Sequence, residues 1–151
     1  MKIQNPFSKP TIFVLFPLLL VLVIDLIFTL AGQPEIYWQN YAFYNEGSPL
    51  GIFFLSQSPF YFILFFIFYI FFVLFIAANL KRPFNIIWTI SFFLGHVWGS
   101  ATWVDNLFYQ SSFGCSCISD WYIKIIYFIF IGIITGIFIN YWISKKKINE
   151  V

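Results

Sequence analysis

Four long apolar runs constrain this chain more than any other feature. They cover residues 11–31, 59–80, 84–104 and 121–143. Each is close to the roughly 20 helical residues that cross the hydrocarbon core of a bilayer. A segment in lipid must satisfy its own backbone hydrogen bonds, which favours helix. The sequence therefore predicts an all-α, multi-pass membrane protein, in which residues 1–151 form one domain built as a four-transmembrane-helix bundle.

Composition excludes a soluble domain of this size. The chain is 61% hydrophobic and 9% charged, too few polar groups to cover a water-exposed surface. We expect the first run to be a permanent span, because it is too long for a signal peptide and no small-residue cleavage site follows it. The expected partner is therefore the lipid bilayer. No nucleic-acid partner is expected, since no basic stripe is interleaved with stacking aromatics.

Charge placement predicts the topology. Basic residues precede the first run, separate the second from the third and follow the fourth: Lys2, Lys9, Lys81, Arg82, Lys145, Lys146 and Lys147. The two opposite loops hold acidic residues and no basic one: Glu35, Glu46, Asp105 and Asp120. Since cytoplasmic loops are enriched in Lys and Arg, both termini are expected in the cytoplasm. The sequence does not identify which membrane holds the protein.

The first outer loop, residues 32–58, is long for so small a bundle. Its segment 34–44 begins with Pro and an acid and is rich in Tyr and Trp, which predicts a short interfacial helix. Residues 50–55 are expected to form an apolar turn or an extension of the second span. The second outer loop, residues 105–120, is expected to be irregular.

Two ionisable residues lie inside predicted spans, Asp25 in the first and His96 in the third. At 1.5 Å per helical residue, both lie roughly 10 Å below the outer surface. A charged Asp at this depth costs about 3 kcal/mol, so such residues usually face the bundle interior and find partners. We expect Asp25 and His96 to pair. Their pair is either a proton-active or cation-binding site, because histidine gains and loses protons near neutral pH, or a structural polar clasp. A protonated Asp25 bonded to Thr29 is the remaining alternative.

Small residues mark two helix faces. Gly95 and Gly99 form a small-xxx-small surface in the third run, and Gly132 and Gly136 repeat it in the fourth. Such surfaces let membrane helices approach closely. The sequence predicts that these two faces pack together.

A stripe of chemistry-bearing residues accompanies the glycines, since His96, Ser100 and Trp103 recur at helical spacing. We expect a pocket in the outer half between the first and third spans, capped by the loop around Tyr37 and Trp38. An aromatic wall beside a carboxylate would favour a hydrophobic or cationic ligand. The candidate ligand-binding residues are Asp25, Thr29, His96, Trp98, Ser100 and Trp103.

Other chemistries fit less well. A serine hydrolase built from Ser100, His96 and Asp25 lacks a strained turn and an oxyanion donor. A metal site of Asp25, Glu46 and His96 would have a single imidazole. No metal and no cofactor are therefore expected.

The two cysteines, Cys115 and Cys117, lie in the second outer loop with one residue between them. They are expected to form a local or intermolecular disulfide or to remain free thiols. The two-residue spacer usual for redox motifs is absent.

The stretch Leu94-Gly-His-Val-Trp-Gly-Ser-Ala-Thr-Trp103 resembles the third-helix pattern of the EXPERA family, which includes emopamil-binding sterol isomerases and sigma-2-receptor-like proteins. Asp25 and Thr29 stand where the isomerases have His and Glu. The second run has no counterpart of the isomerases' Glu, and the fourth lacks their Asn and Trp. The resemblance therefore implies a lipid- or sterol-sized pocket between helices, without isomerase activity.

Three function classes follow. The first is a non-catalytic membrane protein, either a binder of a lipid-like small molecule or an accessory subunit acting through a membrane-complex partner or a homodimer. The second is an enzyme acting on a lipid- or sterol-like substrate at the Asp25/His96 layer. The third is a proton-coupled carrier, which an absence of inverted repeats and broken helices disfavours.

Overall fold

The computed structural model describes the backbone of residues 9–81, 83–110 and 120–148. Its elements in this part of the chain are all helical, so the all-α prediction is confirmed. They are α1 (Lys9–Ala31), the 3-10 turns η1 (Glu35–Trp38) and η2 (Tyr41–Phe43), α2 (Pro49–Leu55), α3 (Pro59–Asn79), α4 (Phe84–Gln110) and α5 (Asp120–Ile148).

Serine caps and first-turn prolines set where α2 and α3 begin. Ser48 Oγ accepts from the Gly51 N–H at the start of α2, and Ser58 Oγ accepts from the Tyr61 N–H at the start of α3. Proline suits the first helical turn because its missing N–H would have no partner there. The chain therefore turns sharply after Leu55, and α2 packs back against α3.

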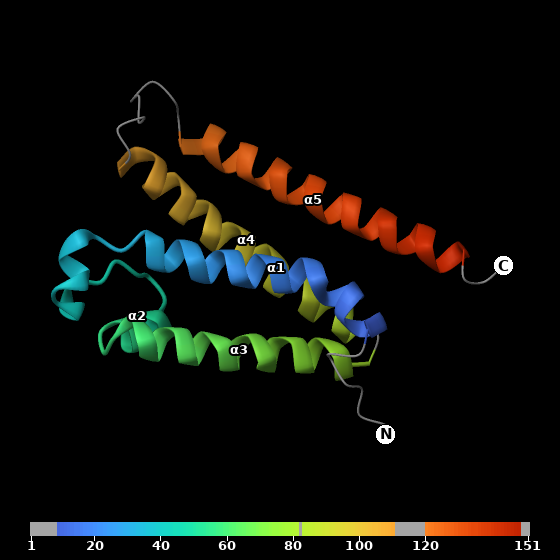
Figure 1. Ribbon diagram of the computed structural model, residues 1–151, viewed down its shortest axis with the longest axis horizontal. Helices are drawn as coiled ribbons and strands as arrows, with labels where there is room; N and C mark the ends of the chain where they lie inside the picture. Colours follow the sequence, from blue (N-terminus) through green and yellow to red (C-terminus); the bar gives the residue numbers. More distant parts are fainter. Residues whose placement is uncertain (1–8, 82, 111–119, 149–151) are drawn as a thin grey trace.

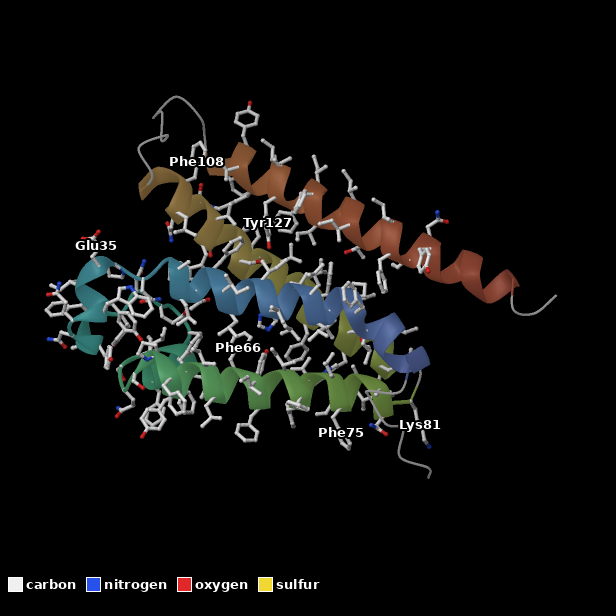
Figure 2. The ribbon with its side chains drawn as sticks, in the orientation of Figure 1. Glu35, Phe66, Phe75, Lys81, Phe108 and Tyr127 are labelled. Carbon is white, nitrogen blue, oxygen red and sulfur yellow. The ribbon has the colours of Figure 1, made fainter. Side chains whose placement is uncertain are left out.

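The four long helices lie side by side, with α1 between α3 and α5 in the view of Figure 1. α1 packs against α3, α4 and α5, and α4 packs against both α3 and α5. The start of α1, the end of α5 and Lys81 lie at one end of the bundle, whereas Glu35 and Phe108 lie at the other (Figure 2).

The core falls into two clusters that share α1. Leu18 and Leu22 join residues of α3 such as Val73, whereas Val21 joins α4 and α5 through neighbours such as Val97. Outward faces of α3 and α5 instead expose large apolar side chains, among them Phe68, Ile126 and Ile137. These exposed faces are what lipid contact requires.

Among the residues that the structure describes, two helical stretches are long and apolar enough to cross a membrane, Pro59–Asn79 and Trp121–Tyr141. In α1, the apolar stretch with described side chains, Leu15–Ala31, is shorter. α4 is long enough to cross a membrane but is less apolar than these two stretches, because it carries polar groups along its length, including His96.

Three predictions about the connections are corrected. Residues 50–55 lie in a separate helix, α2, instead of forming an apolar turn or an extension of the second span, because a turn follows Leu55 and Ser58 caps a new helix. The segment 34–44 forms two 3-10 turns instead of one helix, because Asn40 is extended and its side chain accepts from the Ala42 N–H. Residues 105–110 continue α4 instead of forming irregular loop, because buried Asp105 bonds to Lys124 of α5, with 3.1 Å between Oδ2 and Nζ.

Candidate functional site

A cavity of about 660 Å³ lies between α1, α3 and α4, and residues of the segment 45–51 also line it. α3 contributes an aromatic wall of Phe62, Phe65, Phe66 and Tyr69. α4 contributes one face, with Ser91, Gly95, Gly99, Thr102 and Asn106 among its lining residues. Positions three or four apart share a helix face. Several of the polar groups of α4 therefore converge on the cavity.

Asp25 and His96 meet in this cavity, as the sequence predicts. His96 Nδ1 lies 2.6 Å from Asp25 Oδ2, and the two side chains are 15% and 12% exposed. The other carboxylate oxygen, Oδ1, is buried and has no hydrogen-bond partner in the described part of the chain. The contact joins α1 to α4.

Tyr69 extends this contact to α3, and sequence reasoning missed it. Its hydroxyl lies 2.8 Å from His96 Nε2, so Asp25, His96 and Tyr69 form one chain of hydrogen bonds across three helices. Phe66 and Phe92 pack around the imidazole, with ring centroids 6.1 and 6.3 Å away. A hydroxyl in the middle of a phenylalanine-rich span is costly without a partner, and this signal could have identified Tyr69.

Ser100 was expected in the pocket but lies outside it. The side chain is fully buried, its Oγ donates to the His96 backbone oxygen at 2.6 Å, and it accepts from the Tyr127 hydroxyl at 2.8 Å. The imidazole bonds to Tyr69 instead, so the arrangement of a serine hydrolase is not formed. Ser100 connects α4 to α5.

Of the two candidate tryptophans, only Trp103 lines the cavity. Trp98 is 50% exposed and contacts Trp121 and Phe128 of α5, so its predicted role as a pocket wall is wrong. Each residue along a helix is turned by about 100° from the one before it. Trp98 and Trp103 are five residues apart, so their side chains point about 140° away from each other, to different faces. Thr29 of α1 does line the cavity, as expected.

The segment 45–51, here called the strap, comprises the end of the loop and the first residues of α2, and six of its residues line the cavity. Gln33, two residues after the end of α1, makes two bonds to Asn45: its Nε2 donates to the backbone oxygen, and its Oε1 accepts from the N–H. Nε2 also donates to the Thr29 oxygen at 2.8 Å. Within the strap, Glu46 Oε1 accepts from the N–H groups of Gly47 and Ser48. The buried Gln33 amide therefore links the strap to the last turn of α1.

The predicted cap around Tyr37 and Trp38 does not cover the cavity. Tyr37 is fully buried and donates to the Leu55 oxygen, which fastens η1 to α2. Burial, with a smaller contribution from Tyr41, raises the pKa of Tyr37 to about 12. Trp38 is exposed beside the Tyr37 ring.

The predicted glycine seam between α4 and α5 is also wrong. A Cβ at Gly95, Gly132 or Gly136 would meet nothing within 4 Å, whereas one at Gly99 would lie 3.2 Å from Asp25 Oδ1. The Gly95/Gly99 face is turned toward the cavity and α1, because His96 on the same face bonds to Asp25. The α4–α5 contact uses larger residues instead: Val97, Ala101, Tyr127 and Ile131.

The cavity lining is acidic, with Asp25 and Glu46 and no Lys or Arg. In the described ranges no three His, Cys, Asp or Glu side chains gather as metal ligands would. Cys115 and Cys117 lie outside the described residues.

Comparisons with protein families, with curated proteins and with solved structures found no match for this chain.

Proposed function

We propose that this chain is a small integral membrane protein that binds a lipid-like small molecule in the cavity between α1, α3 and α4, without converting it chemically. The cavity itself carries the proposal. Its volume, about 660 Å³, is within the range typical of small-molecule sites. Such sites combine apolar walls with a few convergent polar groups, and here phenylalanines of α3 line the cavity together with Asp25, His96 and Tyr69.

We propose that all four long helices cross the bilayer. The support for this is the apolar character of α3 and α5 together with the bundle's polarity: the start of α1, Lys81 and the lysine-containing end of α5 share one end. By the positive-inside bias that end is cytoplasmic. The strap and the cavity's loop end then face the opposite side.

A membrane enzyme acting on a lipid- or sterol-like substrate is the second candidate. The chain Asp25–His96–Tyr69 favours it, because a carboxylate that orients an imidazole beside a hydroxyl is an arrangement used in acid–base catalysis. Binding without conversion is preferred, because the cavity alone is sufficient for it, whereas conversion would need further groups that act on the substrate.

The carrier and accessory-subunit alternatives have less support. The cavity lining reaches Tyr69 and Ser91 but includes no residue nearer the Lys81 end, so this cavity does not extend through the described part of the bundle. An accessory subunit would act through a partner or a second copy, and the cavity is not needed for that role.

The proposal is tested by purifying the protein in mild detergent and recording its native mass spectrum. We expect an adduct of lipid-like mass at one copy per chain. After delipidation, adding the extracted molecule should restore the adduct and raise the unfolding temperature. A protein without adduct that copurifies with a larger complex would favour the accessory-subunit alternative. Turnover of the added molecule into a product of different mass would favour the enzyme.

A further inference from the structure

The direction of hydrogen bonding along Asp25, His96 and Tyr69 determines what the cavity offers a ligand. A carboxylate only accepts, a neutral imidazole donates with one nitrogen and accepts with the other, and a phenol does both. With ionised Asp25 and neutral His96, Tyr69 must donate to Nε2, which leaves no O–H for the cavity. The pair has no net charge in two forms: a carboxylate with an imidazolium, or a carboxylic acid that donates from Oδ2 to Nδ1 of a neutral imidazole. In both forms Nε2 carries a hydrogen and donates to Tyr69.

The surroundings favour a pair without net charge. Both side chains are mostly buried, Phe66 and Phe92 pack on the imidazole, and Asp25 Oδ1 has no described donor to stabilise a negative charge. The other charged residue lining the cavity is Glu46, which would repel a net negative pair. A single uncompensated charge inside a membrane protein is costly.

On this basis, and resting on the proposed binding function, we propose that Tyr69 presents its O–H to the cavity and donates it to the ligand. The ligand is then an uncharged lipid whose polar end accepts a hydrogen bond, such as a ketone or an alcohol. An ammonium group has no lone pair, so it cannot accept the Tyr69 hydrogen bond. Tyr69 is thus a specificity-determining residue.

The direction of the chain can be measured without any ligand. The protein has a single histidine, so nitrogen NMR of the isotope-labelled side chain in lipid nanodiscs gives one pair of ring signals. At neutral pH we expect Nε2 to carry a hydrogen. An Nε2 without hydrogen would mean that Tyr69 donates to His96, which would overturn the inference.

Ligand selectivity is measured with four matched probes: a polycyclic ketone, the corresponding alcohol, the parent hydrocarbon and the primary amine. Loss of one hydrogen bond in a buried site costs about tenfold in affinity. We expect the ketone and the alcohol to bind about tenfold more tightly than the hydrocarbon. Tyr69→Phe should reduce the ketone's affinity to that of the hydrocarbon. Tyr61→Phe is the control, because Tyr61 lies on the same helix, is exposed and does not line the cavity.

The outcomes separate this inference from the function on which it rests. If all four probes bind equally, or the amine binds as tightly as the ketone, the selectivity of Tyr69 is rejected and the binding function stands. If none of the four binds and no lipid copurifies, both are rejected. Retained preference for the ketone in Tyr69→Phe would also reject the inference.

Discussion

Asp25 and His96 form a polar contact where the surrounding side chains are mainly apolar. Removing two charged or polar groups from water costs several kcal/mol, and their mutual contact compensates for it only while both are present. Loss of one partner is therefore more harmful than loss of both. The pair's 2.6 Å contact also fixes the position of the imidazole beside Tyr69.

This asymmetry predicts the result of a double-mutant cycle. His96→Ala leaves the buried Asp25 carboxyl without its partner and should cost about 3 kcal/mol in the free energy of unfolding. The double variant Asp25→Ala/His96→Ala should be more stable than His96→Ala alone, because no uncompensated carboxyl remains. Reversible unfolding in mixed micelles measures both. Costs that simply add would show that the two side chains are not coupled.

For single residues, the sequence shows which side chains need a partner. It is a poorer guide to which residue that partner is. The depth and charge of Asp25 and His96 were sufficient to pair them. Tyr69 was missed because a phenol carries no charge to mark it. Ser100 and Trp98 were misplaced, because helical spacing groups residues by face without showing which neighbouring helix that face meets.

At the scale of elements, the strap is the part of the site that α1 controls. Its attachment is the Gln33 side chain, which pairs with both backbone groups of Asn45 in the manner of a β-bridge. Gln33 is 5% exposed, so water does not readily replace these bonds. The strap should therefore be held over the cavity as long as this amide is in place.

Gln33→Ala should release the strap without unfolding the helices. Losing a buried hydrogen bond of about 1–1.5 kcal/mol should accelerate amide hydrogen exchange at Asn45 and along the strap by about tenfold. Exchange in α4 should not change. Gln57→Ala is the matched control, since Gln57 is exposed in the turn between α2 and α3. Unchanged exchange at Asn45 in Gln33→Ala would show that the strap is held by other contacts.

The elements themselves followed from the sequence where length and hydropathy were decisive. The predicted spans agree with α1 and α3 to within a few residues, and the Ser-Pro pairs that begin α2 and α3 are visible in the sequence. The end of α4 was placed too early, because Asp105 was interpreted as the start of a loop. Its partner Lys124 is nearby only once α4 and α5 lie together.

At the scale of the whole molecule, the long helices arrange themselves around α1, and the polar chain decides which faces meet (Figure 1). The sequence predicted a close α4–α5 seam from glycine spacing. The structure uses the Gly95/Gly99 face for the cavity, because the same face carries His96 and its partner is on α1. Glycine spacing alone cannot distinguish a packing surface from a cavity wall, since both require the absence of side chains.

Gly95 provides the most direct test of the central claim that the cavity is a ligand site. A Cβ there would meet nothing within 4 Å, so we expect the Gly95→Leu side chain to enter the cavity and occupy part of it without disturbing the packing. Gly132→Leu is the control, since Gly132 is equally open but does not line the cavity. The measurement is the ligand-induced shift in unfolding temperature of each purified, delipidated variant. We predict that Gly95→Leu loses the shift, whereas Gly132→Leu keeps it and both unfold near the temperature of the parent protein without ligand. A full shift in Gly95→Leu would contradict the account, because the ligand would then bind somewhere other than this cavity.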